Sequence, residues 1–115
     1  MINVALGKDT PAPLVGATVF VNDCAEVHVR ALDERVKGNQ NFIASAGPVV
    51  WNDVNEIVKN GFGVKAMEHG LKLGGNLDTI PLDFDTAETY KEFRLEWVPF
   101  EQQVKSVVGH FLELE

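Results

Sequence analysis

Glycine and proline break this chain so often that no helix or strand can be long. Ten glycines and five prolines are spread over 115 residues, and both residue types interrupt regular backbone. Between the breaks, short β-branched runs alternate with apolar residues at helical spacing. The pattern predicts one domain, residues 1–115, of α/β (α+β) class, with two or more short strands and three to four helices.

The segments between the breaks give the expected elements. Strands are expected at 17–21 (ATVFV) and 41–45 (NFIAS). Helices are expected to begin at Asp23, Trp51, Asp85-Thr86 and Pro99, and to end before Gly38, at Asn60-Gly61, near Lys91 and close to the C-terminus. Asp23 and Glu26 fit a capping box, and proline is favoured in a first helical turn. The glycine-rich residues 62–82 are expected to form a loop with at most one short element.

The helix expected from Asp23 has a one-sided apolar pattern. Its spacing places on one face the residues Cys24, Val27, His28, Ala31, Leu32 and Val36. Such a stripe is typical of the side of a helix that packs against a core. Cys24 and His28 are therefore expected to be buried.

Charge and cysteine content argue against several classes of partner. Seventeen acidic residues against ten basic ones give a net charge of −7, which repels nucleic-acid phosphates. Lysine and arginine are not clustered, so binding to an anionic membrane is not expected. The single cysteine fits a reducing compartment, and the first residues lack the regions of a signal peptide. A cytoplasmic protein with neither nucleic-acid nor membrane partners is expected.

The segment from Val19 to Leu32, VFVNDCAEVHVRAL, resembles a known family. Extended short-chain dehydrogenase/reductases of the dihydroflavonol-reductase and fungal ketoreductase type carry a strand followed by a V-D-V-A-x-A-H-V-x-A-L motif. The resemblance continues in order through Gly38-Asn39, Phe42-Ile43, Ala46-Gly47, Trp51-x-Asp53, Phe84-Asp85-Thr86 and residues 100–115. It covers residues 3–115 and implies the C-terminal, substrate-binding half of such a reductase.

The chemistry of that family lies mainly in an N-terminal dinucleotide-binding half, to which nothing in this sequence corresponds. No Gly-x-x-Gly-x-x-Gly follows an expected strand, so no cofactor is expected. The only tyrosine, Tyr90, is followed four residues later by Arg94, where the catalytic pair of the family has lysine. The resemblance therefore does not imply a self-sufficient dehydrogenase.

Three side chains are candidates for acid–base chemistry. His28 could be a general base if its pKa is tuned near neutrality, or a hydrogen-bonded core histidine. His69, beside Glu68 in the glycine-rich loop, could reach a ligand or be an ordinary solvated side chain. Asp83 is the carboxylate candidate. No His-Glu-x-x-His or paired-cysteine motif occurs, so no metal site is expected.

Four large side chains are candidate contacts for a hydrophobic small molecule: Trp51, Met67, Phe84 and Trp97. The resemblance implies that the aromatic ones surround a substrate pocket, and pockets for apolar ligands need such a lining. The alternative is that these residues belong to the core.

The leading hypothesis is a non-redox enzyme derived from a reductase substrate domain. It would bind a hydrophobic metabolite and promote an isomerisation, cyclisation or elimination. The alternatives are a non-catalytic ligand-binding or interaction module, and a fragment of an NAD(P)-dependent reductase that is inactive without its dinucleotide half. The surface that faces this half in the family would be exposed here, and an apolar patch of that size needs a cover. We expect a homodimer, because two-fold dimers are the commonest assemblies.

Overall fold

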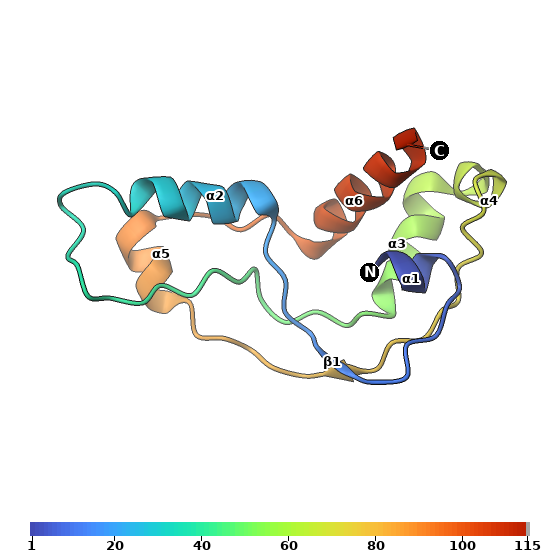
Figure 1. The fold of residues 1–115 in the computed structure, drawn as a ribbon, viewed down its shortest axis with the longest axis horizontal. Coiled ribbons are helices and arrows are strands. Elements are labelled where there is room, and N and C mark those ends of the chain that lie inside the picture. The colour runs from blue at the N-terminus through green and yellow to red at the C-terminus, as the bar shows by residue number, and fades with distance from the viewer. Residues whose placement is uncertain (115) are drawn as a thin grey trace.

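Helix α3 (Asp53–Phe62) is the centre of the hydrophobic core in the computed structural model, which describes residues 1–114 (Figure 1). It packs against α1 (Ile2–Ala5), α4 (Val64–Glu68) and the long α6 (Phe100–Leu114). Fully buried valines recur every four residues, at Val54 and Val58 of α3 and at Val104 and Val108 of α6. This spacing places each pair on one side of its helix, so the two helices meet along apolar faces.

Two short strands lie beside this core. Strand β1 (Leu14–Val15) pairs in parallel with β2 (Thr79–Ile80). The two remaining helices, α2 (Val21–Arg30) and α5 (Ala87–Phe93), lie at the other end of the molecule (Figure 1). The expected fold class is confirmed, since the fold is small and mixed α/β. The sequence predicts three to four helices, whereas residues 1–114 form six, the short α1 and α4 among them. Residues 62–82 hold both α4 and β2, so the expectation of at most one short element there is wrong.

The strands expected at 17–21 and 41–45 are wrong. Backbone pairing with β2 ends at Gly16, whose N–H donates to the carbonyl of Ile80 at 3.0 Å. Beyond it, Ala17 makes only an isolated antiparallel bridge, and residues 41–45 are in neither a helix nor a strand. A β-branched run favours extended backbone but becomes a strand only where a neighbouring backbone pairs with it.

Helix α2 begins at Val21, two residues before the expected start, and ends at Arg30, well before Gly38. Asp23 therefore lies in the first turn and does not cap the helix. Its side chain is buried, and its carboxylate accepts a hydrogen bond from the backbone N–H of Val98. The carboxylate is thus bonded to a residue distant in the sequence instead of capping its own helix.

The apolar stripe expected on α2 is not buried. Of its members only Val27 is buried; His28 is exposed, and the Leu32 side chain is 85% exposed. The helix meets the rest of the protein on a narrow side, where the Arg30 guanidinium donates to the carbonyl of Phe93 at 2.5 Å. Helical spacing identifies an apolar face, but it cannot show whether another element covers that face.

The other expected helices are confirmed within a few residues. Helix α3 starts two residues after Trp51 and ends one residue past Gly61. Helix α5 starts at Ala87, whose backbone N–H donates a hydrogen bond of 3.0 Å to the Asp85 carboxylate. Helix α6 starts directly after Pro99, and Glu115, the last residue of this expected helix, lies outside the described residues.

The molecule is elongated, measuring 50 × 29 × 19 Å. Its radius of gyration is 16.3 Å, whereas a compact chain of this length has about 13 Å. Extended segments connect the core end, with α1, α3, α4 and α6, to the end that holds α2 and α5 (Figure 1). Within residues 1–114, every helix is too short or too polar to cross a membrane.

Candidate functional site

An apolar groove lies in the extended region that connects the two ends of the molecule. Three segments that are distant in the sequence form its walls, and its volume is about 270 Å³. We call it the Phe84 groove; its lining residues are Ala17, Thr18, Val19, Ile43, Ala44, Ser45 and Phe84. The groove thus uses both segments that the sequence predicts as strands.

Two hydrogen bonds hold the walls of the groove together. The backbone N–H of Ala46 donates to the carbonyl of Thr18 at 2.8 Å, which joins the first wall to the second. The hydroxyl of Thr89, a buried residue of α5, donates to the carbonyl of Ile43 at 2.8 Å. Helix α5 therefore fixes the second wall and also brings in Phe84, which precedes it by three residues. The groove depends on the position of α5 as much as on its own residues.

Two hydroxyl groups interrupt this apolar lining. Ser45 is buried, and its oxygen accepts a long hydrogen bond of 3.5 Å from the N–H of Gly47. The hydroxyl oxygen of Thr18 is also buried, and it has no hydrogen-bond partner among the described residues. A buried polar group without a partner costs about 1–3 kcal/mol. An acceptor atom on a bound molecule would remove that cost.

The structure does not bring the three acid–base candidates together. His28 is on α2 and His69 directly follows α4, and these helices lie at opposite ends of the molecule (Figure 1). Both side chains are exposed, so the expected burial of His28 is wrong. Its Nδ1 lies 2.7 Å from the carbonyl oxygen of Cys24 in its own helix. Asp83 is exposed as well, but it directly precedes Phe84 of the groove.

The four candidate ligand contacts also separate in the structure. Phe84 lines the groove, whereas Trp51 is buried in the core, where its ring makes an edge contact with Phe100 at a centroid distance of 6.2 Å. Trp97 is half-buried between α5 and α6, and Met67 is exposed on α4. Of the four, only Phe84 is part of the groove.

The sequence does not single out Thr18, Ile43 or Ser45 as site residues. Their segments look like strands, in which alternate side chains are core or solvent. The groove arises because two extended segments, joined by only sparse backbone pairing, lie next to each other and leave a hollow between them. How far two segments pair is a property of the tertiary structure, so no local sequence signal could indicate it.

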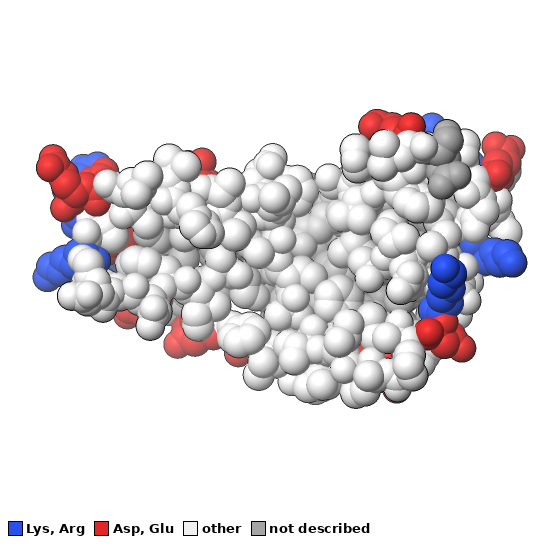
Figure 2. Space-filling model, in the orientation of Figure 1, with Lys and Arg blue, Asp and Glu red and all other residues white. Residues whose placement is uncertain are grey.

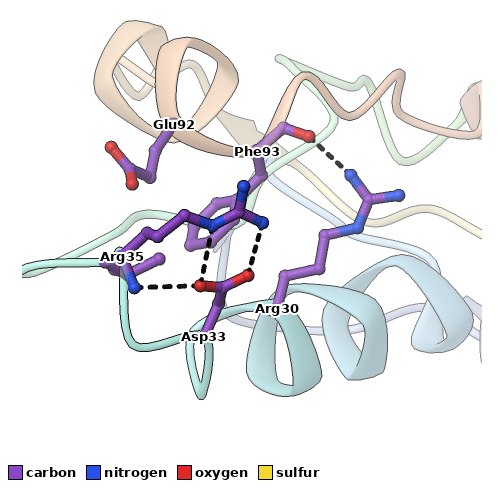
Figure 3. Close-up of a pocket in the computed structure, with 6 residues that line it drawn as sticks. Arg30, Asp33, Arg35, Glu92 and Phe93 are labelled. Carbon is purple, nitrogen blue, oxygen red and sulfur yellow. Dashed lines mark hydrogen bonds and ion pairs between the residues drawn. The ribbon is translucent and has the colours of Figure 1, made fainter.

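A second cavity, of about 510 Å³, lies between α5 and the residues that follow α2 (Figure 3). Its charged side chains are Arg30, Asp33, Arg35 and Glu92, two of each sign. Arg35 faces Asp33 and donates to both of its carboxylate oxygens, at 3.1 and 2.8 Å (Figure 3). An anion bound here would compete with that carboxylate. Within the cavity, Asp33 and Arg35 thus neutralise each other, while Arg30 pairs with Glu26 outside it. No group of three or more potential metal-ligating side chains occurs among the described residues.

Comparison with known proteins gives relatives in sequence, while no family model and no solved structure matches. Ketoreductase CTB6 of Cercospora beticola and that of Cercospora nicotianae are each 33% identical over 118 aligned residues, which cover 98% of this chain and 33% of the relative. Ketoreductase sphI of Aspergillus fumigatus is 25% identical over 95 residues, 83% of this chain and 27% of that protein. The chain spans about a third of the length of the curated relatives it matches. These relatives support a reductase-related family; that the chain corresponds to a C-terminal half stays a prediction.

Proposed function

We propose that this chain is the substrate-binding part of a ketoreductase-type protein and binds an apolar carbonyl compound in the Phe84 groove. The relatives named ketoreductase support the reductase relationship. The observation that carries the proposal is the Thr18 hydroxyl, a buried group without a partner among the described residues, beside a largely apolar hollow. A carbonyl oxygen is the acceptor that such a hydroxyl lacks.

The two parts of such a ligand match two parts of the groove. Phe84 and Ile43 offer apolar surface, and each is partly exposed without ligand, so covering them with an apolar molecule is favourable. Rotation of Thr18 about χ1 to another staggered rotamer would turn its hydroxyl toward the ligand oxygen. The groove would thus orient a ketone with its oxygen at Thr18 and its body against Phe84.

Binding is favoured over catalysis by the chain alone because two of the acid–base candidates are remote from the groove. The placement of His28 and His69 on helices at opposite ends argues against either acting on a ligand bound there. The second candidate function is a non-redox isomerisation or elimination in which Asp83 moves the proton. The observation that favours it is the position of Asp83 directly before Phe84.

Titration with prodan, a fluorescent aromatic ketone, tests the proposal. We expect saturable binding with a blue-shifted emission, because the probe leaves water for an apolar site. Phe84→Ala should weaken binding about tenfold through lost apolar contact. Thr18→Val, which keeps the shape and removes the hydroxyl, should weaken binding roughly threefold to tenfold.

Leu32→Ala is the matched control, since it shortens a highly exposed apolar side chain outside the groove. It should leave the prodan affinity unchanged. Equal affinities in the wild type, Phe84→Ala and Thr18→Val would reject the groove as the binding site. For the second candidate function we expect Asp83→Asn to bind prodan with the wild-type affinity, because Asp83 would move a proton and would not hold the ligand. Weaker binding by this variant would instead assign Asp83 to ligand binding.

A further inference from the structure

A second groove adjoins the Phe84 groove. It has a volume of about 230 Å³ and runs from the start of α2, where Phe20 and Val21 line it, to Val107 on α6. We call it the Val107 groove. The proposed function does not use it.

Buried polar contacts at Val98 hold the two walls of the Val107 groove together. The backbone N–H of Val98 donates to the carboxylate of Asp23 in α2 at 2.8 Å, and the carbonyl of Val98 accepts from the side-chain amide of Gln103 in α6 at 2.9 Å. Asp23 and Gln103 are both buried, and Gln103 also lines the groove. Val98 thus joins α2 to α6, so the groove is formed before any ligand binds, as most ligand sites are.

The two grooves meet at Thr18 and Val19, which line both of them. Pockets for drug-sized ligands hold about 300–1,000 Å³. The grooves, of about 270 and 230 Å³, each fall below that range, but together they hold about 500 Å³. Thr18, whose buried hydroxyl has no partner among the described residues, is therefore at the junction of two grooves and not at the edge of one.

The lining of the two grooves limits the charge of a ligand. None of the side chains that the structure places along either groove is charged. In the view of Figure 2 the lysine, arginine, aspartate and glutamate side chains gather at the two ends and along the lower rim, and the broad middle is uncharged. A charged group buried in such a lining would lose its hydration without gaining an opposite charge. A ligand that fills both grooves is therefore uncharged.

We propose that the two grooves together bind one uncharged ketone that carries an apolar group on each side of its carbonyl. The inference rests on the proposed function, in which the ketone oxygen accepts from Thr18 and one apolar part lies against Phe84. It adds a second apolar arm, which continues past Thr18 and packs against Val21 and Val107. These two valines are 71% and 41% exposed without ligand, so covering them is favourable.

The position of the carbonyl distinguishes this ligand from other carbonyl compounds. Because Thr18 is at the junction of the grooves, the carbonyl lies in the middle of the ligand. An aldehyde or a methyl ketone would fill only one groove and leave the apolar surface of the other in water. The site would therefore prefer internal ketones.

Fluorescence titration with two homologous ketones tests this inference. Prodan has a short acyl group, and its octanoyl homologue has the same ring system with a longer acyl chain. We expect the wild type to bind the homologue more tightly than prodan by roughly tenfold or more, because the added methylenes leave water for the Val107 groove. Val107→Asp should abolish this gain, since it places a carboxylate where the chain lies, and should leave the affinity for prodan unchanged.

Val50→Asp is the matched control, since Val50 is 52% exposed and lies just before α3, outside both grooves. It should keep the gain, and urea unfolding of both variants would show that they fold. Equal affinities of the wild type for the two probes, or a gain that Val107→Asp retains, would overturn the inference. Prodan binding that Phe84→Ala weakens would still support the proposed function in that case. Absence of saturable prodan binding would instead reject the proposed function, and this inference with it.

Discussion

The carboxylate of Asp23 in α2 accepts a hydrogen bond of 2.8 Å from the backbone N–H of Val98, which is 75 residues further along the chain. Val98 lies between α5 and α6, so this bond fixes the start of α2 to the segment that leads into the core. Arg30 makes the corresponding bond at the other end of α2, to the carbonyl of Phe93. Two polar contacts thus position a helix that buries little apolar surface.

Loss of the Asp23 carboxylate should therefore destabilise the protein. We expect Asp23→Ala to lower the free energy of unfolding by about 2 kcal/mol, the scale for a hydrogen bond to a charged group. Urea denaturation measures this change. The control is Asn22→Ala, an exposed neighbour in the same helix, which should change the stability by less than about 0.5 kcal/mol. Equal losses in the two variants would mean that the Asp23–Val98 bond does not hold α2.

Thr18→Val should change stability and ligand affinity in opposite directions. In the free protein it replaces a buried hydroxyl that has no partner in the described structure, so we expect the free energy of unfolding to rise by about 1 kcal/mol. The same variant should bind prodan more weakly because the donor is gone. Thermal unfolding and fluorescence titration of one sample give both values. A loss of stability would show that the hydroxyl already has a partner in solution.

Gly16→Ala should be severely destabilising. A Cβ at this position would lie 2.1 Å from the carbonyl oxygen of Val49 and 2.5 Å from the Thr79 side chain, so the backbone at the end of β1 must move. We expect a loss of about 3 kcal/mol. Gly38→Ala is the matched control, because a Cβ there meets nothing within 4 Å; it should be neutral or stabilise by a few tenths of a kcal/mol. Similar unfolding midpoints for the two variants would contradict the close approach at Gly16.

The Asp33–Arg35 pair should give an acid-dependent contribution to stability. Hydrogen bonds from the Arg35 side chain, and then from its backbone N–H, lower the pKa of Asp33 from 3.8 to about 2. Because the folded pKa is below the unfolded one, the pair stabilises the fold above about pH 4 and loses this effect as the pH falls toward 2. The contribution is small, since both side chains are in contact with water.

NMR titration of the Asp33 carboxyl carbon measures this pKa directly. We expect a midpoint near 2 in the wild type. Arg35→Gln should raise the pKa of Asp33 toward 3.8, although the backbone N–H of residue 35 still donates to it. A wild-type midpoint at the ordinary value for aspartate would show that the ion pair does not persist in solution.

The helices of the core are the part of the fold that the sequence predicts well. Val54 and Val58 of α3, and Val104 and Val108 of α6, recur at helical spacing in the sequence and are fully buried in the structure. Pro99 and Asp85 mark the starts of α6 and α5 by local rules that need no distant partner. Phe84 is the one candidate ligand contact that lines the groove.

The chain end that holds α2 is where sequence reasoning was wrong. The stripe through His28 and Leu32 has the same spacing as the stripe on α3, yet both of these side chains are exposed. The first stripe is not covered by another element, and α2 ends at Arg30, before Leu32. Whether an element packs on such a face is decided by residues far away in the sequence. The same holds for residues 17–21 and 41–45, which have the composition of strands but make too little backbone pairing to form one.

The sequence by itself determined where helices form, because spacing, capping and proline placement act within a few residues. It also determined the reductase relationship, which the ketoreductase relatives support. Only the tertiary structure decided which helix faces are covered by other elements and that the Asp23 carboxylate accepts a hydrogen bond from the N–H of Val98. It also decided that Thr18 and Phe84 line one groove. These features depend on contacts between segments distant in the chain. Burial and hydrogen-bond pairing at such contacts are properties of the assembled fold and not of any local stretch of residues.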